Sequence, residues 1–172
     1  MLFSEKMNSA INDQVGHEFG ASLQYVAIAG YFDHEGLPEL AAHFYQQAEE
    51  ERAHAMRFVH YVLDAGGQLN IPTIPAPKPK FGSAEEAVQQ SLDWETTVTG
   101  QINALVDLAL TENDHTTKNF LNWFVTEQLE EISSVNTLLS IVRRAGNDGL
   151  LFVESYIARG RGPGSVPAAP AT

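Results

Sequence analysis

The sequence contains no cysteine, few basic residues and no long hydrophobic run. Without cysteine the chain has no disulfide, no thiolate metal site and no cysteine nucleophile. Ten basic residues against 22 acidic ones give a formal net charge of -12, which disfavours nucleic acid and anionic membranes and attracts cations. No stretch approaches the roughly 18 apolar residues that cross a membrane, and no signal peptide is evident. We therefore expect a cytoplasmic protein with neither a membrane nor a nucleic-acid partner.

The length and composition indicate one domain with one core. The chain has 172 residues, of which 44% are hydrophobic, and this is enough to bury a core and too many for a disordered chain. Gly, Pro and Ala dominate the C-terminal residues, which is typical of a flexible tail. We expect a helical domain over residues 1–159 and a flexible tail over residues 160–172.

Apolar residues recur at alternating steps of four and three in four long segments, the pattern of a packed helix. Ser83 with Glu86 three residues later indicates a capping box, and Gly66-Gly67 is typical of a helix end. We predict helices over about Ser4–Asp33 and Pro38–Ala65, a third from Ser83 past Ala109, a fourth after Asn113-Asp114 to beyond Val142, and a short helix over Leu150–Ala158.

The lengths of the connections predict the topology. The first two helices are joined by four residues, and the third and fourth by a few residues near Asn113, so each pair is antiparallel. The link over residues 66–82 contains four prolines. Extended, it would span about 55 Å, whereas a helix of 28 residues is about 42 Å long. We expect this link to cross the full bundle and make the second and third helices parallel.

The apolar seam of each long helix is interrupted near its middle by polar residues. Helix centres in a bundle lie at one height whichever way the chains run, so these side chains should meet in one inward-facing layer. The six residues are Glu18, Glu51, His54, Glu95, Gln128 and Glu131.

Such a layer is unfavourable without a partner. Glutamate is almost never fully buried unless it is paired, and no Lys or Arg lies on any seam. Divalent cations would neutralise the buried carboxylates, because carboxylates and imidazoles are their ligands. Glu51 and His54 are three residues apart, so they share one face of a helix and can bind one ion together. Mixed nitrogen and oxygen ligands suit iron, manganese or zinc better than calcium.

Several motifs resemble those of the non-haem bacterial ferritins. The similarity covers about Ser4 to Ala158 and includes Glu18 followed by Tyr25, and then the segments AEEERAHAM (48–56), WETTVTGQIN (94–103) and LNWFVTEQLEE (121–131). The resemblance implies an all-α, ferritin-like four-helix bundle with a long crossover between helices two and three and a short fifth helix.

The resemblance also implies a role for each residue of the polar layer. Glu18 and His54 match ligands of a first iron, Glu51 matches a bridging glutamate, and Glu95 and Glu131 match the carboxylates of a second iron. Gln128 matches a weak ligand or a residue just outside the ligand shell.

A third iron position is implied beside the pair, formed by Glu50, Glu127 and Glu130 with Glu131 shared. A solvated acidic flank is the alternative for these residues. Tyr25 and Trp123 match aromatic residues that lie near the irons and supply an electron, although both also suit ordinary core packing.

The function that the resemblance implies is iron storage and detoxification. Two Fe(II) ions per subunit would be oxidised by dioxygen or hydrogen peroxide, which is a ferroxidase activity. The Fe(III) would be deposited as mineral inside a hollow homo-oligomeric shell of 24 copies, with acidic positions near Glu112 and Asp114 lining an entry channel. Haem is not expected, because Arg52 stands where haem-binding relatives place a methionine, and Glu131 where they place a histidine.

Two other classes of function use similar residues. A di-iron peroxidase or oxygenase would have the same ligands beside an open pocket or an electron-donor domain. A non-catalytic helical scaffold would keep its glutamates protonated or hydrated, and metal would not change its stability.

Overall fold

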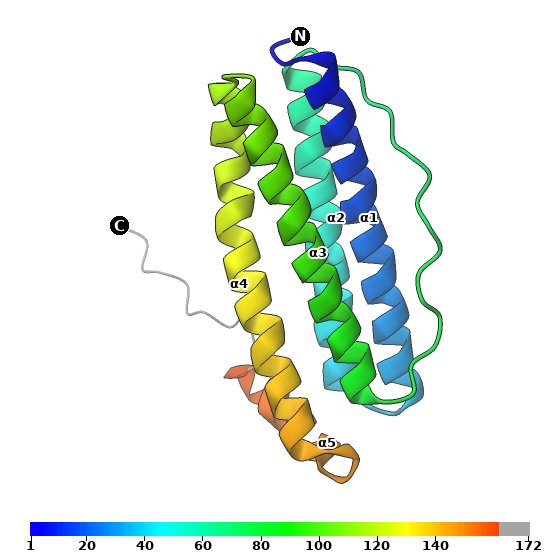
Figure 1. The fold of residues 1–172 in the computed structure, drawn as a ribbon. Helices are drawn as coiled ribbons and strands as arrows, with labels where there is room; N and C mark the ends of the chain where they lie inside the picture. The colour runs from blue at the N-terminus through cyan, green and yellow to red at the C-terminus, as the bar shows by residue number, and fades with distance from the viewer. Residues whose placement is uncertain (162–172) are drawn as a thin grey trace.

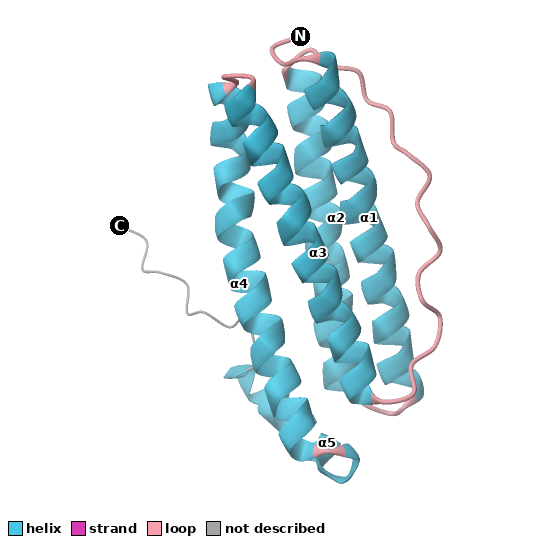
Figure 2. Ribbon diagram, in the orientation of Figure 1, coloured by secondary structure: helices cyan, strands magenta, loops and turns pink. Residues whose placement is uncertain are grey.

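The computed structural model describes residues 1–161, which form helices and loops and contain no strand (Figures 1 and 2). The long helices are α1 (Glu5–His34), α2 (Pro38–Asp64), α3 (Ala84–Thr111) and α4 (His115–Ala145), and a short α5 (Leu150–Tyr156) follows a 3-10 turn over Asn147–Gly149. The predicted all-α bundle is confirmed. The predicted tail lies outside the described residues, apart from Gly160 and Arg161.

Side-chain caps begin three of the four long helices, and the sequence indicated one of them. The Ser83 hydroxyl accepts from the backbone N–H of Glu86 at 3.1 Å, as a capping box requires. The Glu86 carboxylate accepts from the N–H of Gly82 at 2.7 Å instead of that of Ser83, so the reciprocal bond lies one residue earlier than predicted. Ser4 and Asp114 cap α1 and α4 in the same way.

The short C-terminal helix differs from its prediction. Regular α-helix ends at Tyr156 and not at Ala158, and a wider turn over Ile157–Arg161 contains Gly160 with φ 65°. A positive φ is readily adopted by glycine and breaks helical geometry. The regular α-helix therefore stops two residues before the predicted end.

The four long helices form two antiparallel hairpins, α1 with α2 and α3 with α4 (Figure 1). The loop between α2 and α3 runs along the whole bundle, so that α2 and α3 are parallel, as predicted. No helix within residues 1–161 combines the length and apolar composition that crossing a membrane requires.

Side-chain amides of α1 hold the crossover loop against the bundle. Asn8 accepts from the backbone N–H of Gln68 at 3.0 Å and donates to its carbonyl at 3.1 Å. Gln24 accepts from the N–H of Lys78 at 2.8 Å. These bonds satisfy backbone groups that an extended segment cannot satisfy within itself. Amides on α1 therefore help to fix the path of the loop.

The apolar core is divided into two clusters by a polar layer. One cluster lies toward the α5 end and includes Phe32, Phe44 and Leu138. The other lies toward the N-terminal end of α1 and includes Met7 and Phe58. The buried polar side chains at mid-height separate the two clusters, and they form the candidate site.

Candidate metal centre

All six side chains of the predicted polar layer are buried, which is unusual for charged groups. Their exposed fractions are between 1% and 6%, for Glu18, Glu51, His54, Glu95, Gln128 and Glu131. They come from all four long helices, which bring them to one level because each stands near the middle of its helix. Their role in binding metal stays a prediction.

Three of the six form a compact group of potential ligands. One ligand atom from each of Glu18, Glu51 and His54 lies within 4.8 Å of the other two. His54 Nδ1 is 3.4 Å from Glu51 Oε2, as the spacing of three residues on α2 predicted. Within residues 1–161 this is the only group of its kind. It corresponds to the predicted position of the first iron.

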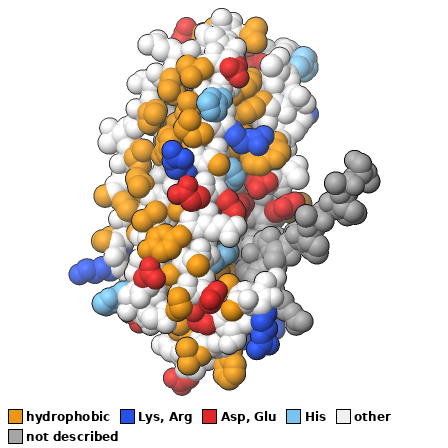
Figure 3. All heavy atoms as spheres, turned by 180° about the vertical axis from the view of Figure 1, so that it is seen from behind, with side chains coloured by type: hydrophobic (Ala, Val, Ile, Leu, Met, Phe, Trp, Pro, Cys, Tyr) orange, Lys and Arg blue, Asp and Glu red, His pale blue; other side chains and the backbone are white. Residues whose placement is uncertain are grey.

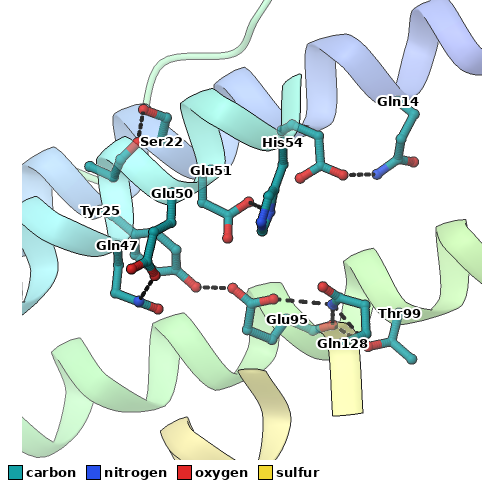
Figure 4. A network of polar contacts seen from close by, with 12 residues as sticks. Gln14, Ser22, Tyr25, Gln47, Glu50, Glu51, His54, Glu95, Thr99 and Gln128 are labelled. Atoms are coloured by element: carbon teal, nitrogen blue, oxygen red, sulfur yellow. Dashed lines mark hydrogen bonds and ion pairs between the residues drawn. The ribbon is translucent and has the colours of Figure 1, made fainter. Parts of the chain in front are cut away.

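Glu95 faces this group from α3 and is held by hydrogen bonds. Tyr25 donates its hydroxyl to Glu95 Oε1, and Gln128 Nε2 donates to Glu95 Oε2 at 3.2 Å (Figure 4). Burial raises the pKa of Glu95, while these two bonds act to lower it. Gln128 is therefore a hydrogen-bond donor to a predicted ligand, and its own role at a metal centre stays a prediction.

Burial and mutual repulsion make the other carboxyls hard to ionise. Burial first, and then the neighbouring Glu51, raises the pKa of Glu18 well above its ordinary value. Burial, followed by Glu95, does the same for the pKa of Glu51. Burial, followed by Glu95, raises the pKa of Glu131 to about 8.

No basic side chain neutralises these carboxyls in the described part of the chain. The Lys and Arg residues in ion pairs, Lys78 and Arg143, bind Glu86 and Glu85 near the surface. When these acids are ionised, they repel one another in a medium of low dielectric. Such a site favours a multivalent cation.

One atom of the site lacks a partner and tests whether the residues suit a metal ion. Glu18 Oε2 is buried and has no hydrogen-bond donor among residues 1–161. Leaving a buried carboxylate oxygen unpaired costs free energy, and a cation removes that cost. Carboxylate oxygens with one imidazole nitrogen are a ligand set that suits Fe(II). The residues present therefore fit the predicted ion.

The three carboxylates of the predicted third position are less buried than the six. Glu50 and Glu127 are half-buried, and Glu130 is exposed. Glu50 accepts from Gln46 Nε2 at 2.8 Å. Burial raises the pKa of Glu127, and Glu130 and Glu50 add to the rise by repulsion, so the three carboxylates interact electrostatically without forming a compact ligand group. Figure 3 shows acidic side chains gathered at mid-height on the face seen from behind Figure 1.

Two aromatic residues, Tyr25 and Trp123, border the group. Tyr25 is buried, and its pKa is raised well above the ordinary value by burial and then by Glu95. The Trp123 ring is 5.4 Å from that of His54, centroid to centroid. The guanidinium of Arg57 lies 3.7 Å above the Trp123 ring, a cation–π contact that packs the indole against the ligand helix.

Sequence reasoning missed one hydrogen-bonding partner of the group. Gln14 is buried, and its Nε2 donates to Glu18 Oε1 at 2.8 Å. The signal was present, because residues four apart share one helix face and Gln14 lies on the α1 seam with Glu18.

The residues suggested for an entry channel have structural partners. Glu112 accepts from the Ser4 hydroxyl at 2.7 Å, and Asp114 caps α4. Both also line a surface cavity of about 610 Å³, so their part in iron entry stays a prediction.

Comparison with known proteins gives consistent matches. Residues 8–145 match the family model described as the ferritin-like domain. The chain is 44% identical over 166 residues to ferritin BfrB of Mycolicibacterium smegmatis, covering 96% of this chain and 91% of the relative. It is 37% identical over 147 residues to a bacterial non-heme ferritin of Staphylococcus aureus, covering 86% and 89%.

Solved structures agree with the sequence matches. An open-pore ferritin from the archaeon Archaeoglobus fulgidus superposes with a TM-score of 0.89 at 33% identity, covering 91% of this chain and 97% of that one. A form of that ferritin engineered to be closed gives a TM-score of 0.87.

Proposed function

This chain belongs to the ferritin family, whose members store iron, and we propose that it oxidises Fe(II) at the centre formed by Glu18, Glu51, His54, Glu95 and Glu131. Iron is the substrate of this reaction and the material that is stored. The resemblance that the sequence showed to non-haem bacterial ferritins is confirmed by the family match together with the match to the bacterial non-heme ferritin of Staphylococcus aureus.

The observation that carries the proposal is the unpartnered Oε2 of Glu18 beside Glu51 and His54. Four buried carboxyls without a basic neighbour are unfavourable in the metal-free protein. Binding two divalent cations provides positive charge where the chain itself has none. A helical scaffold without a metal would retain this cost with no compensating interaction.

Each residue has a part in the proposed reaction. Glu18 and His54 hold one Fe(II), Glu95 and Glu131 hold the other, and Glu51 supplies one oxygen to each. Each Fe(II) gives up one electron. The pair reduces dioxygen to hydrogen peroxide, or hydrogen peroxide to two water molecules, and either reaction takes up two protons. The protein supplies geometry and negative charge, which favours Fe(III) over Fe(II) in the same site.

The neighbouring residues support the same chemistry. Gln128 and Tyr25 hold Glu95 in place by hydrogen bonds, and Tyr25 lies where it can give an electron to the site. Glu50, Glu127 and Glu130 form an acidic face beside Glu131, suited to a third iron on its way to the mineral. We assign no haem to this chain, because Arg52 occupies the position at which haem-binding relatives have a methionine.

Storage requires an enclosed volume, and we infer that copies of this chain form a hollow shell of 24. The words "open pore" and "closed form" describe the Archaeoglobus ferritin, which has the same fold as this chain. In α5, Leu151 and Phe152 are 72% and 80% exposed. Large apolar side chains on one short helix favour contact with another copy.

The test is the rate of Fe(II) oxidation in air after anaerobic loading. The double variant Glu51→Ala/His54→Ala removes two ligands of the compact group, and we expect oxidation to slow by more than about 100-fold, beyond the effect of losing an outer partner. Glu49→Ala is the matched control, because Glu49 is an exposed carboxylate on the same helix. Oxidation by the double variant at the parent rate would contradict the proposed site.

A further inference from the structure

The two oxygens of the Glu18 carboxylate have different surroundings. Gln14 Nε2 donates to Oε1 at 2.8 Å. Oε2 is buried and accepts no hydrogen bond from a donor group within residues 1–161. One oxygen is therefore held by the protein, and the other is free to bind an ion. Figure 4 shows Gln14 at the edge of the polar network, with its amide nitrogen in a hydrogen bond.

The position of Gln14 favours this hydrogen bond. Its side chain is 2% exposed, so water does not compete for the amide. It lies one helical turn before Glu18, and side chains four residues apart on a helix face one another. The carboxylate can accept but not donate a hydrogen bond when it is ionised, so the amide presents its NH₂ group and points its oxygen away.

The amide oxygen of Gln14 faces the outside of the site. It is 3.5 Å from Nδ1 of His17, which is exposed. Gln14 and His17 also line a groove of about 450 Å³ between α1 and α3. Gln14 therefore lies between this groove and the buried Glu18, and its amide has one defined orientation.

We propose that Gln14 is a positioning residue that reserves Glu18 Oε2 for the first Fe(II), so that Glu18 binds through one oxygen. The proposal rests on the proposed function, because it concerns the same centre. Without the amide, Oε1 is also unpartnered, and the carboxylate is free to rotate or to bind the ion with both oxygens. Partners of this kind orient metal ligands, and their loss typically costs about 10–100-fold in metal affinity.

The chain offers a matched control in the same groove. Gln101 lines this groove from α3, and its Oε1 is buried without a hydrogen-bond partner among residues 1–161. Replacing either glutamine by leucine removes one amide of the same size from the same cavity. Only the change at Gln14 removes a bond to Glu18.

The experiment is an anaerobic titration of the assembled protein with Co(II), which reports coordination through its visible absorption. We expect Gln14→Leu to lower the affinity for the first Co(II) by about 10–100-fold and to change the visible absorption of the bound ion. Gln101→Leu should leave the Co(II) affinity and the absorption of the bound ion unchanged. Gln14→Met, which keeps the length and flexibility of the side chain, repeats the test if Gln14→Leu does not fold.

The possible results separate this inference from the proposed function. Equal affinity and equal spectra for the parent and the Gln14 variants would overturn the positioning role alone. Weaker binding with an unchanged spectrum would also overturn it, because a structural defect weakens the site without changing how Glu18 binds. If the parent protein binds Co(II) no better than the Glu51→Ala/His54→Ala variant, both the positioning role of Gln14 and the proposed metal centre would be overturned.

Discussion

Glu131 is the residue whose protonation links the site to pH most directly. Burial and then repulsion from Glu95 raise its pKa to about 8. The same carboxyl has a pKa of about 4.3 in an unfolded chain. Between these values the folded, metal-free protein binds a proton that the unfolded chain has released. The contribution of Glu131 to the free energy of unfolding is therefore fully present below about pH 4.3 and is lost as the pH rises through 8.

We predict that the stability of the metal-free protein falls between pH 5 and pH 8, by an amount on the order of a few kcal/mol. The variant Glu131→Gln removes the titrating group and should make this fall smaller. The urea midpoint at several pH values is the measurement, with Glu130→Gln as the control because Glu130 is the exposed neighbour on the same helix. Equal pH dependence in all three proteins would show that Glu131 does not titrate in this way.

The seam pattern predicted which residues are buried at mid-height but not how they pair. It located Glu18, Glu51 and Glu95 because each stands near the middle of a helix. It did not predict that Glu18 and Glu51 gather with His54 while Glu95 accepts from Tyr25 and Gln128. Those pairings depend on side-chain rotamers and on small rotations of each helix, which periodicity does not encode.

At the scale of elements, α2 begins without a cap of its own. Leu37 precedes it and offers no side-chain acceptor. The carboxylate of Glu154 in α5 caps the helix instead. It accepts hydrogen bonds from the backbone N–H groups of Glu39 at 2.8 Å and Leu40 at 2.9 Å. A carboxylate at a helix N-terminus also interacts favourably with the helix dipole. This contact between distant segments attaches α5 to the bundle and was not predictable from local sequence.

We predict that Glu154→Ala lowers the free energy of unfolding by about 1–2 kcal/mol, the usual effect of losing an N-terminal cap. Hydrogen exchange should become faster in α5 and at the start of α2. Ser155→Ala is the control, because Ser155 is exposed and bonds only within α5. Unchanged exchange in α5 would mean that other contacts hold this helix.

Two glycines of α1 make a paired test of the crossover. A Cβ atom at Gly16 would clash with Cγ of Pro72, whereas one at Gly30 would meet nothing within 4 Å. Alanine in a helix is favoured over glycine by about 1 kcal/mol. We predict that Gly30→Ala raises the melting temperature, and that Gly16→Ala does not, because the loop must move.

The melting curves of the two variants are the measurement for this pair. A rise in melting temperature for Gly16→Ala as large as that for Gly30→Ala would show that the loop is loosely held.

The length of the link between α2 and α3 predicted that it crosses the bundle. Its close approach to Gly16 could not be predicted, because it depends on Asn8, Gln24 and other amides meeting particular backbone groups in three dimensions.

Taken as a whole, the molecule exposes large apolar side chains on α5 and acidic side chains at mid-height. In α5, Leu151 and Phe152 are 72% and 80% exposed, and large apolar side chains exposed together favour contact with another protein surface. Acidic side chains gather at mid-height on the face in Figure 3. In a shell, apolar contacts between copies would bury the first set, and the acidic face would be available to iron.

We predict that Phe152→Asp prevents or weakens assembly, because it places a charge in an apolar contact. Light scattering with size exclusion should give a smaller particle than the parent. Thr97→Asp adds the same charge at an exposed polar position of α3 and should leave the particle size unchanged. A full-sized particle from Phe152→Asp would exclude this residue from the contact.

Crystallography can show whether the carboxylates and the imidazole at mid-height bind two iron ions. Crystals soaked anaerobically with Fe(II) and measured at the iron absorption edge should show two anomalous peaks within each bundle. We predict one peak between Glu18, Glu51 and His54, and a second between Glu51, Glu95 and Glu131. Iron found only at surface carboxylates, with neither interior position occupied, would show that the mid-height layer is not the iron site.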